Sequence, residues 1–287
     1  MKIENIKKIF LSKIHSFTSK KIQIKKNNFK IIKSSDDKSE GFLYIVVGKT
    51  HSLEALISIK TLSETSLKSI AIITDTPEIF KDQKNINFIY KIQKNHIRPK
   101  VDFINASPFK KTVYIDSDTA ILEDIDDIFD VINKHELVLT FCISRKRKII
   151  SDKIKEYKDI PESFSEVNTG VIGFLKNKNT TRFFNSWRKN FYKYSKETNG
   201  YDQPSFRVSL WKHTLNKIYL PHEYNVRSIE NIKKTIILKH LFYKNYLKPK
   251  ILHGHNRRNK NYTELLKNYK KYVSALKKKY KKIKIHY

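Results

Sequence analysis

The sequence predicts an α/β fold, in which a mostly parallel β-sheet is flanked by helices. Between residues 42 and 122, short runs rich in Ile, Val and Phe alternate with stretches whose apolar residues recur at helical spacing. This alternation is typical of parallel strands joined by helices. Gly48, Asp75 and Asp116 each directly follow one of the apolar runs. Because ligands bind where the carboxyl ends of parallel strands meet, we expect a site at that edge.

The first half of the chain has the more regular pattern. A strand over 42–47 precedes a helix. The apolar residues of that helix are expected to share one face, formed by Leu53, Leu56, Ile57, Ile59 and Leu62. Strands follow at 70–74 and 86–89, and a helix over about 98–106 leads to the strand 113–115.

The second half is less regular. We expect a strand over 167–175, a helix around 180–194 and another helix after residue 204. Extended segments follow at 217–221 and 250–255. No internal repeat or low-complexity segment stands out, so a length of 287 residues favours one large domain with added ends.

The two ends of the chain differ from the middle. Residues 1–40 are expected to form a basic amphipathic N-terminal extension, 41–260 the domain, and 261–287 a basic C-terminal helix. Both ends combine apolar residues at helical spacing with many lysines. They could contact an anionic membrane peripherally or pack against the domain.

The chain is strongly basic, with 59 Lys and Arg residues against 28 acids and a formal charge of +31. This charge favours polyanions such as nucleic acid, anionic membranes or phosphorylated ligands. Nucleic-acid binding is disfavoured as the main function, because no zinc pattern, RNP-like motif or helix-turn-helix signal occurs. The single cysteine, Cys142, excludes an intramolecular disulfide and is expected in the core. No apolar stretch suits a membrane span or a signal peptide, so we expect a cytoplasmic protein, with peripheral membrane contact still open.

Two acids, Asp116 and Asp118, follow the apolar strand ending at residue 115. Ionised carboxylates are costly in an apolar environment, so this spacing invites a divalent cation, which would in turn hold phosphates. A simple strand end with solvated acids is the alternative. Ala120 stands where aspartyl phosphatases carry Thr or Val, and no P-loop or dinucleotide fingerprint occurs. A second acidic pair, Asp124 and Asp126, is interpreted as a structural helix start.

The segment 97–122 resembles the donor-site segment of glycogenin-like, GT-A-fold glycosyltransferases, which include the lipopolysaccharide sugar transferases. The distance along the chain from Lys100 to Asp116 agrees with that family. Further segments match in the same order, namely Asn168-Thr-Gly-Val171, Asp202-Gln203, Leu220-Pro-His-Glu-Tyr-Asn225 and Ile251-Leu-His253. The resemblance covers roughly 42–258 and implies a GT-A, Rossmann-like sheet. It departs from the family after His253, where Asn256 replaces a glycine and basic residues follow.

The resemblance also implies site residues. Mn²⁺ or Mg²⁺ would be held by Asp116, Asp118 and His253, with His255 as the alternative ligand. Binding of the nucleotide-sugar donor is assigned to Val47, Gly48, Lys49, Asp75, Lys100, Asp116, Ser117, Asp118 and Arg257. Asn168 and Asp202 would bind sugar hydroxyls, and Gln203 would lie near the anomeric carbon, so these three form the catalytic group.

The expected function is therefore transfer of a sugar from a nucleotide-diphosphate sugar, such as a UDP-sugar, to a hydroxyl. The acceptor would be a glycan, glycolipid or protein, and the resemblance implies retention of anomeric configuration. Specificity for the acceptor is expected in the loops over 144–166 and after residue 194. Two alternatives stay open: a sugar-nucleotide nucleotidyltransferase, and a non-enzymatic basic polyanion-binding protein.

Overall fold

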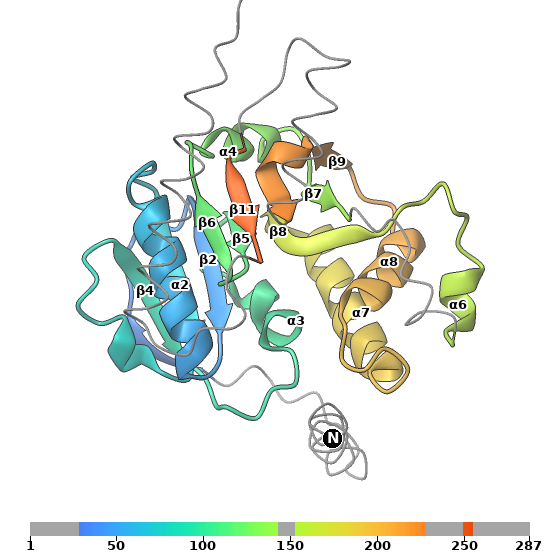
Figure 1. Cartoon of the computed structure of the whole chain (residues 1–287), viewed down its shortest axis with the longest axis horizontal. Coiled ribbons are helices and arrows are strands. Elements are labelled where there is room, and N and C mark those ends of the chain that lie inside the picture. The colour runs from blue at the N-terminus through green and yellow to red at the C-terminus, as the bar shows by residue number, and fades with distance from the viewer. Residues whose placement is uncertain (1–28, 143–152, 228–248, 255–287) are drawn as a thin grey trace, which may run out of the picture.

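The computed structural model of the chain describes residues 29–142, 153–227 and 249–254. Their centre is an eight-stranded sheet in the order β1-β4-β3-β2-β5-β8-β7-β9 (Figure 1). Its strands are β1 Lys30–Lys33, β2 Glu40–Val46, β3 Ser69–Thr74, β4 Ile86–Lys91, β5 Lys111–Ile115, β7 Leu137–Phe141, β8 Val167–Leu175 and β9 Lys217–Leu220. Every core strand expected from the apolar runs is present.

Strand direction places several chain segments at one edge of the sheet. β2, β3, β4 and β5 run parallel, whereas β8 is antiparallel to both β5 and β7. β7 and β9 are parallel to each other, so they run in the direction of β5. The carboxyl ends of these parallel strands therefore lie at the same edge as the start of β8, which carries Asn168.

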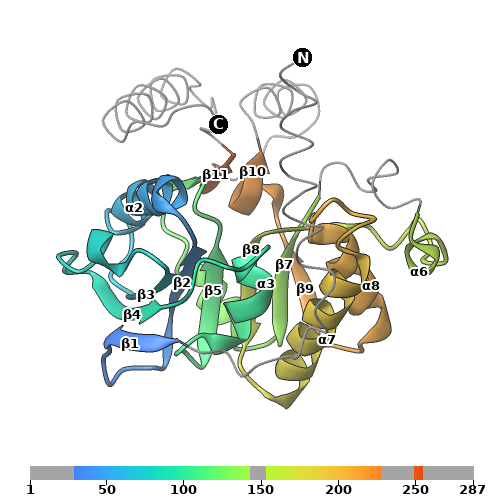
Figure 2. The ribbon, with the colours of Figure 1, turned by 90° about the horizontal axis from the view of Figure 1, so that it is seen from below.

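Helices cover both faces of the sheet, giving three layers (Figure 2). The helices are α2 Lys49–Leu62, α3 Pro99–Phe103, α4 Asp127–Ile132, α6 Lys155–Lys158, α7 Lys178–Tyr194 and α8 Gln203–Lys212, with short 3₁₀ turns η1 Pro77–Ile79, η2 Ile104–Ala106 and η3 His222–Asn225. One apolar core joins α3, α7 and α8 to the sheet, and a second joins α2 and α4 to the opposite face. Along β2, Leu43 belongs to the first core and Tyr44 to the second, as alternation along a strand requires.

The buried face of α2 differs from the expected apolar face. Leu53 and Leu56 are only half-buried, whereas Ser58 is fully buried. The Ser58 hydroxyl lies 3.0 Å from Tyr44 Oη and 2.7 Å from Thr119 Oγ1. Helix α2 therefore packs through the small side chain of Ser58 against Thr119, in the strand that follows the acidic pair. The helix and the strand lie so close together that a hydroxyl fits between them but a leucine side chain does not.

A second, three-stranded sheet was not expected from the sequence. It consists of β10 Val226–Arg227, β11 Ile251–His253 and β6 Thr119–Ile121, in that order. β11 pairs antiparallel with β6, and the register places His253 opposite Thr119. This small sheet brings the last described segment of the chain beside the acidic pair.

The region expected to be an N-terminal extension also contains a strand. Residues 30–33 form β1, the edge strand of the main sheet, which pairs antiparallel with β4, and the Phe29 ring stacks on that of Tyr90 at 4.7 Å. The remaining extension up to residue 28 and the C-terminal residues 255–287 lie outside the described residues. The expected basic helices with their membrane contact, as well as His255 and Arg257, thus fall outside the described part of the chain. No helix among the described ranges is long and apolar enough to cross a membrane.

Candidate metal and donor site

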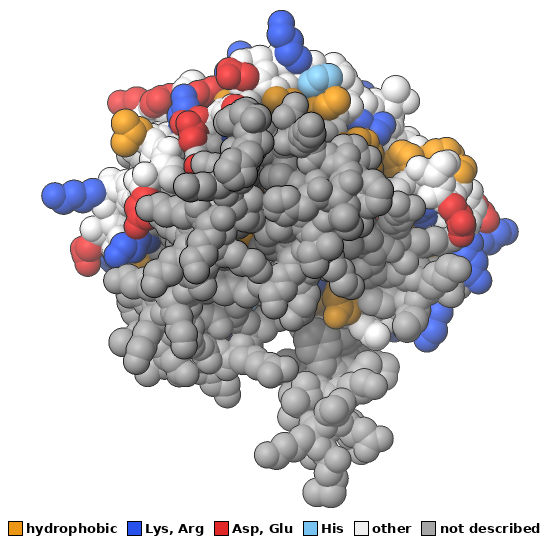
Figure 3. All heavy atoms as spheres, turned by 45° about the horizontal axis from the view of Figure 1, so that its top comes forward, with side chains coloured by type: hydrophobic (Ala, Val, Ile, Leu, Met, Phe, Trp, Pro, Cys, Tyr) orange, Lys and Arg blue, Asp and Glu red, His pale blue; other side chains and the backbone are white. Residues whose placement is uncertain are grey.

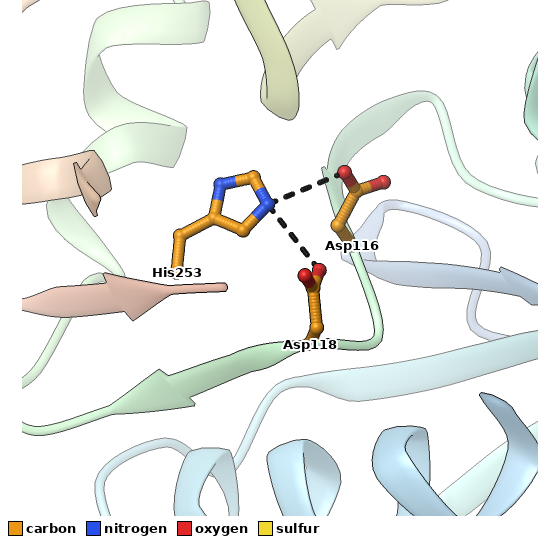
Figure 4. Close-up of side chains that lie close together, drawn as sticks. All are labelled: Asp116, Asp118 and His253. Carbon is orange, nitrogen blue, oxygen red and sulfur yellow. Dashed lines mark ion pairs between the residues drawn. The ribbon is translucent and has the colours of Figure 1, made fainter. Parts of the chain in front are cut away.

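Asp116, Asp118 and His253 converge at the carboxyl edge of the main sheet. Each offers one ligand atom, and these atoms all lie within 4.8 Å of one another. His253 Nε2 is 3.5 Å from Asp116 Oδ2 and 3.3 Å from Asp118 Oδ1. Figure 4 shows the imidazole at the end of β11 pointing toward both carboxylates, which come from the loop between β5 and β6.

Local backbone structure produces this convergence. Asp116 follows the last residue of β5, and β6 begins three residues later at Thr119, whose hydroxyl donates to the Asp116 carbonyl at 2.8 Å. The turn therefore presents both carboxylates from a short, tightly held loop. Gly254 N donates to the Asp118 carbonyl at 2.7 Å and has a φ of +79°, a conformation that L side chains rarely adopt.

Gly170 makes room for the imidazole. A Cβ atom at this position would lie 2.1 Å from His253 Cε1 and 2.7 Å from Nδ1. Gly170 is in β8, and its carbonyl accepts from Asp116 N at 2.8 Å. Only glycine at this position allows the buried ring to approach the strand that supports Asp116.

Lys100 lies between the half-buried carboxylate of Asp116 and the buried carboxylate of Asp202. Its Nζ is 3.2 Å from Asp116 Oδ1 and 3.2 Å from Asp202 Oδ2, and it donates to the Thr169 carbonyl at 3.0 Å. Arg98 Nη2 lies 3.4 Å from Asp202 Oδ1. Two cations thus face two acids in a site where the side chains of Lys100 and Asp202 are almost fully buried.

The pKa values of these acids reflect the balance of burial and charge. Burial raises the pKa of Asp116, but Lys100 and His253 outweigh it and hold this pKa far below its usual value. Burial likewise raises the pKa of Asp202, and Lys100 and Arg98 reverse the shift. Burial lowers the pKa of His253, yet hydrogen bonds to Asp116 and Asp118 raise it overall. Asp116 and Asp202 are therefore carboxylates at neutral pH.

The other expected site residues lie along the same edge. Asp202 immediately precedes α8 and accepts from Thr169 Oγ1 at 2.7 Å, while Gln203 Nε2 donates to the Val167 carbonyl at 2.9 Å. Asn168 Oδ1 accepts from Gly170 N at 2.8 Å. Asp202, Gln203 and Asn168 therefore surround the start of β8.

The end of β2 forms the far side of the site. Asp75 Oδ1 accepts from Gly48 N at 2.8 Å, which ties the ends of β3 and β2 together. Gly48 has a φ of +87°, and a Cβ there would meet no atom within 4 Å. Val47 is half-buried and Lys49 exposed, and Ser117 is half-buried between the two acids.

Three residues near the site had no assigned role before the structure was known. Arg98 and Thr169 contact Asp202, and Asn225 Oδ1 lies 2.8 Å from His253 Nδ1. All three occur inside the segments that resemble the glycosyltransferase family, so their position in the sequence could have marked them as candidate site residues. Their roles depend on contacts between distant segments, which spacing alone does not give.

The competing acidic pair is engaged locally. Asp124 Oδ1 accepts from Asp126 N at 2.7 Å, and Asp126 Oδ1 accepts from Ser66 Oγ at 2.6 Å. Asp126 lies immediately before α4. These contacts agree with the interpretation of that pair as a structural helix start.

The donor set at Asp116, Asp118 and His253 fits a divalent cation. Carboxylate oxygens suit Mg²⁺ and Mn²⁺, and an imidazole nitrogen is a common third ligand for transition metals. The second nitrogen of the ring is already bound to Asn225, as is usual for a metal-ligating histidine. The residues present therefore suit Mn²⁺ or Mg²⁺.

No family model and no curated protein matches the sequence. Solved structures do match its fold. The apo structure of the bifunctional glycosyltransferase WbbM matches with a TM-score of 0.53 and 12% identity over 84% of this chain, which spans only 52% of the WbbM chain.

The galactosyltransferase LgtC, in complex with donor and acceptor sugar analogues, matches with a TM-score of 0.54 and 9% identity. That match covers 82% of this chain and 95% of LgtC. An active-site mutant of LgtC gives a TM-score of 0.52 at 8% identity, covering 80% and 95% of the two chains. The expected fold is thus confirmed: the chain has the GT-A fold of the glycosyltransferases LgtC and WbbM.

Proposed function

We propose that this chain is a metal-dependent glycosyltransferase. In this proposal it moves a sugar from a nucleotide-diphosphate sugar, such as a UDP-sugar, to a hydroxyl of a glycan, glycolipid or protein, with retention. The observation that carries the proposal is the convergence of Asp116, Asp118 and His253 at the carboxyl edge of a GT-A sheet. Ligands bind at this edge in open α/β sheets, and the three side chains suit a cation that accompanies a diphosphate.

The proposed donor site extends from the end of β2 to the acidic pair. Val47, Gly48, Lys49 and Asp75 would receive the nucleoside, and Ser117 and Arg257 would assist at the diphosphate. Asp116, Asp118 and His253 would hold Mn²⁺ or Mg²⁺. When bound, the cation would neutralise the negative charge that develops on the departing diphosphate.

The proposed sugar pocket is the buried polar cluster beside the acidic pair. Asp202 is an ionised carboxylate next to Lys100, so it can accept hydrogen bonds from sugar hydroxyls. Lys100 and Asn168 would complete the donor contacts, and Gln203 would lie near the anomeric carbon. In a retaining transfer, the acceptor oxygen bonds to the anomeric carbon while the bond to the diphosphate breaks. The departing phosphate oxygen takes the acceptor proton.

The acidic content of the site separates this proposal from simple polyanion binding. On the face shown in Figure 3, Lys and Arg side chains of the described residues lie at several separate places, with Asp and Glu side chains among them. A polyanion held by scattered lysines would not need Asp116 or Asp118. A nucleotidyltransferase would instead use a nucleoside triphosphate and a sugar phosphate.

The test is a thermal-shift screen of UDP- and GDP-sugars with and without Mn²⁺, followed by turnover of any ligand that binds. Wild type should show a metal-dependent shift, and Asp118→Asn should abolish both the shift and turnover. Asp124→Asn is the matched control, because Asp124 is exposed in the competing acidic pair. No metal-dependent shift with any nucleotide sugar, or equal turnover by Asp118→Asn, would refute the proposal. Pyrophosphate release from UTP and a sugar phosphate would favour the nucleotidyltransferase.

The proposal extends to the cellular location of the protein and to its acceptor. The basic ends, predicted over 1–40 and 261–287, are candidates for peripheral contact with an anionic membrane, where a glycolipid acceptor would be presented. Acceptor specificity is proposed for the loops over 144–166 and after residue 194.

A further inference from the structure

We propose that Asn225 is a positioning residue that fixes the ring of His253, so that Nδ1 carries a hydrogen and Nε2 faces Asp116 and Asp118. The inference rests on the metal site of the proposed function and deepens it. Asn225 occupies the last position of η3, and β10 continues directly from it to pair with β11, the strand of His253. It touches no proposed substrate and acts through the histidine.

The argument begins at a backbone donor. Gly170 N donates to Asn168 Oδ1 at 2.8 Å. A backbone N–H can only donate, so the side-chain atom of Asn168 facing it has to be the oxygen. The orientation of the Asn168 amide is therefore decided by the strand itself.

The same oxygen decides the orientation of Asn225. Asn225 Nδ2 lies 2.8 Å from Asn168 Oδ1 and 2.7 Å from Thr140 Oγ1. A flipped Asn225 amide would place its oxygen against the oxygen of Asn168, which cannot donate. The nitrogen of Asn225 therefore faces Asn168 and Thr140, and its oxygen faces the imidazole.

The imidazole is the last member of the chain of hydrogen bonds. Asn225 Oδ1 lies 2.8 Å from His253 Nδ1, so Nδ1 has to be the donor. In a neutral ring the lone pair is then on Nε2, the nitrogen that lies 3.3 Å from Asp118 Oδ1. A metal needs this lone pair, because an imidazole ligates only through an unprotonated nitrogen.

Burial and anchoring make Asn225 hard to replace. Asn225 and His253 are 2% and 5% exposed, so little room is left for water to substitute for the amide oxygen. The neighbouring Tyr224 hydroxyl donates to Asp127, and Lys250 N donates to the Glu223 carbonyl at 2.8 Å. These contacts hold η3 and the start of β11 in one arrangement, so the amide meets the ring at a fixed distance.

The test compares Asn225→Leu with two controls. Asn190→Leu removes a buried amide of α7 that donates to Ser209 Oγ of α8 at 2.8 Å. Thr140→Val removes one acceptor of Asn225 but leaves Asn168 to orient it. The Kd for Mn²⁺ is measured by calorimetry without nucleotide. A ¹⁵N NMR spectrum of the Mg²⁺-loaded protein with ¹⁵N-labelled histidine shows which ring nitrogen of His253 carries the hydrogen.

Asn225→Leu is expected to weaken Mn²⁺ binding by about 10- to 100-fold and to remove the Nδ1–H signal, as loss of a residue orienting a metal ligand does. Both controls should keep the wild-type Kd and signal, although Asn190→Leu lowers thermal stability. If folded Asn225→Leu binds Mn²⁺ as wild type does, or if wild type carries the hydrogen on Nε2, this inference is wrong while the proposed function stands. If wild type binds no Mn²⁺, both are wrong.

Discussion

Gly170→Ala tests whether His253 belongs to a metal site. The added methyl group would lie 2.1 Å from His253 Cε1, whereas ordinary contacts of a Cβ atom begin at 3.4 Å. The ring would have to retreat by about 1.3 Å, the difference between these two distances. The strand cannot yield instead, because β8 is hydrogen-bonded to β5 on one side and to β7 on the other.

Such a displacement is large for a metal ligand. Ligand distances in metal sites vary by only about 0.2 Å, so a shift beyond 1 Å removes the imidazole from coordination. We expect the Kd for Mn²⁺ to rise by about 100-fold, equivalent to about 2.8 kcal/mol. Calorimetric titration of Mn²⁺ into the folded variant measures it.

Gly173→Ala provides the matched control. It adds the same methyl group to the same strand, where the nearest atoms are side-chain carbons of Val138, Ile132 and Ile128 at 3.0 to 3.3 Å. These side chains can give by a few tenths of an ångström, so Mn²⁺ affinity should be preserved. Equal Mn²⁺ affinity of Gly170→Ala and Gly173→Ala would refute the assignment of His253 as a ligand.

Three further predictions concern buried charges. Arg207→Met should lower the free energy of unfolding by about 3 kcal/mol or more, because the guanidinium donates to the carbonyls of residues 157, 160, 161 and 164. Urea unfolding measures the loss, and a loss below about 1 kcal/mol would contradict the prediction. Lys100→Met should lower the Tm, because Asp116 and Asp202 lose the cation that they share. Added Mn²⁺ should restore part of the lost Tm, and a Tm that Mn²⁺ does not raise would count against metal binding at Asp116. Burial raises the pKa of Asp102, but hydrogen bonds from His96, Arg188 and Tyr192 bring it below the ordinary 3.8. This carboxylate therefore stabilises the fold above pH 3.8 and less as the pH falls through its lowered pKa, so the stability deficit of Asp102→Asn should be larger at pH 7 than at acidic pH; a constant deficit would refute this.

Most strands of the main sheet could be predicted from the sequence because they are continuous apolar runs of several residues, whereas β1, in the expected N-terminal extension, was not predicted. β8 begins and ends where expected, at Val167 and Leu175, since it is buried on both faces. β6 and β10 contain three and two residues and carry no recognisable period. Their existence depends on pairing with β11, which lies more than a hundred residues beyond β6.

The site was predictable to a similar extent. The order of the matched segments indicated that Asp116, Asp118 and His253 would meet, and the structure brings their ligand atoms together. The supporting contacts could not be predicted. Asn225 reaches His253 only through the pairing of β10 with β11, and Gly170 is required because of a close approach that no local pattern reports.

The charge of the site and the charge of the chain lead to different conclusions. The chain carries a formal +31, which would attract any phosphorylated ligand to its surface. At the site, however, Asp116 and Asp118 face the position proposed for a diphosphate, and Asp116 is ionised. Like charges at such distances repel strongly where burial lowers the dielectric constant. In the proposed function, a cation bound between the diphosphate and the carboxylates would offset this repulsion. The basic chain would then favour the approach of the donor, and the acidic pair would hold the cation.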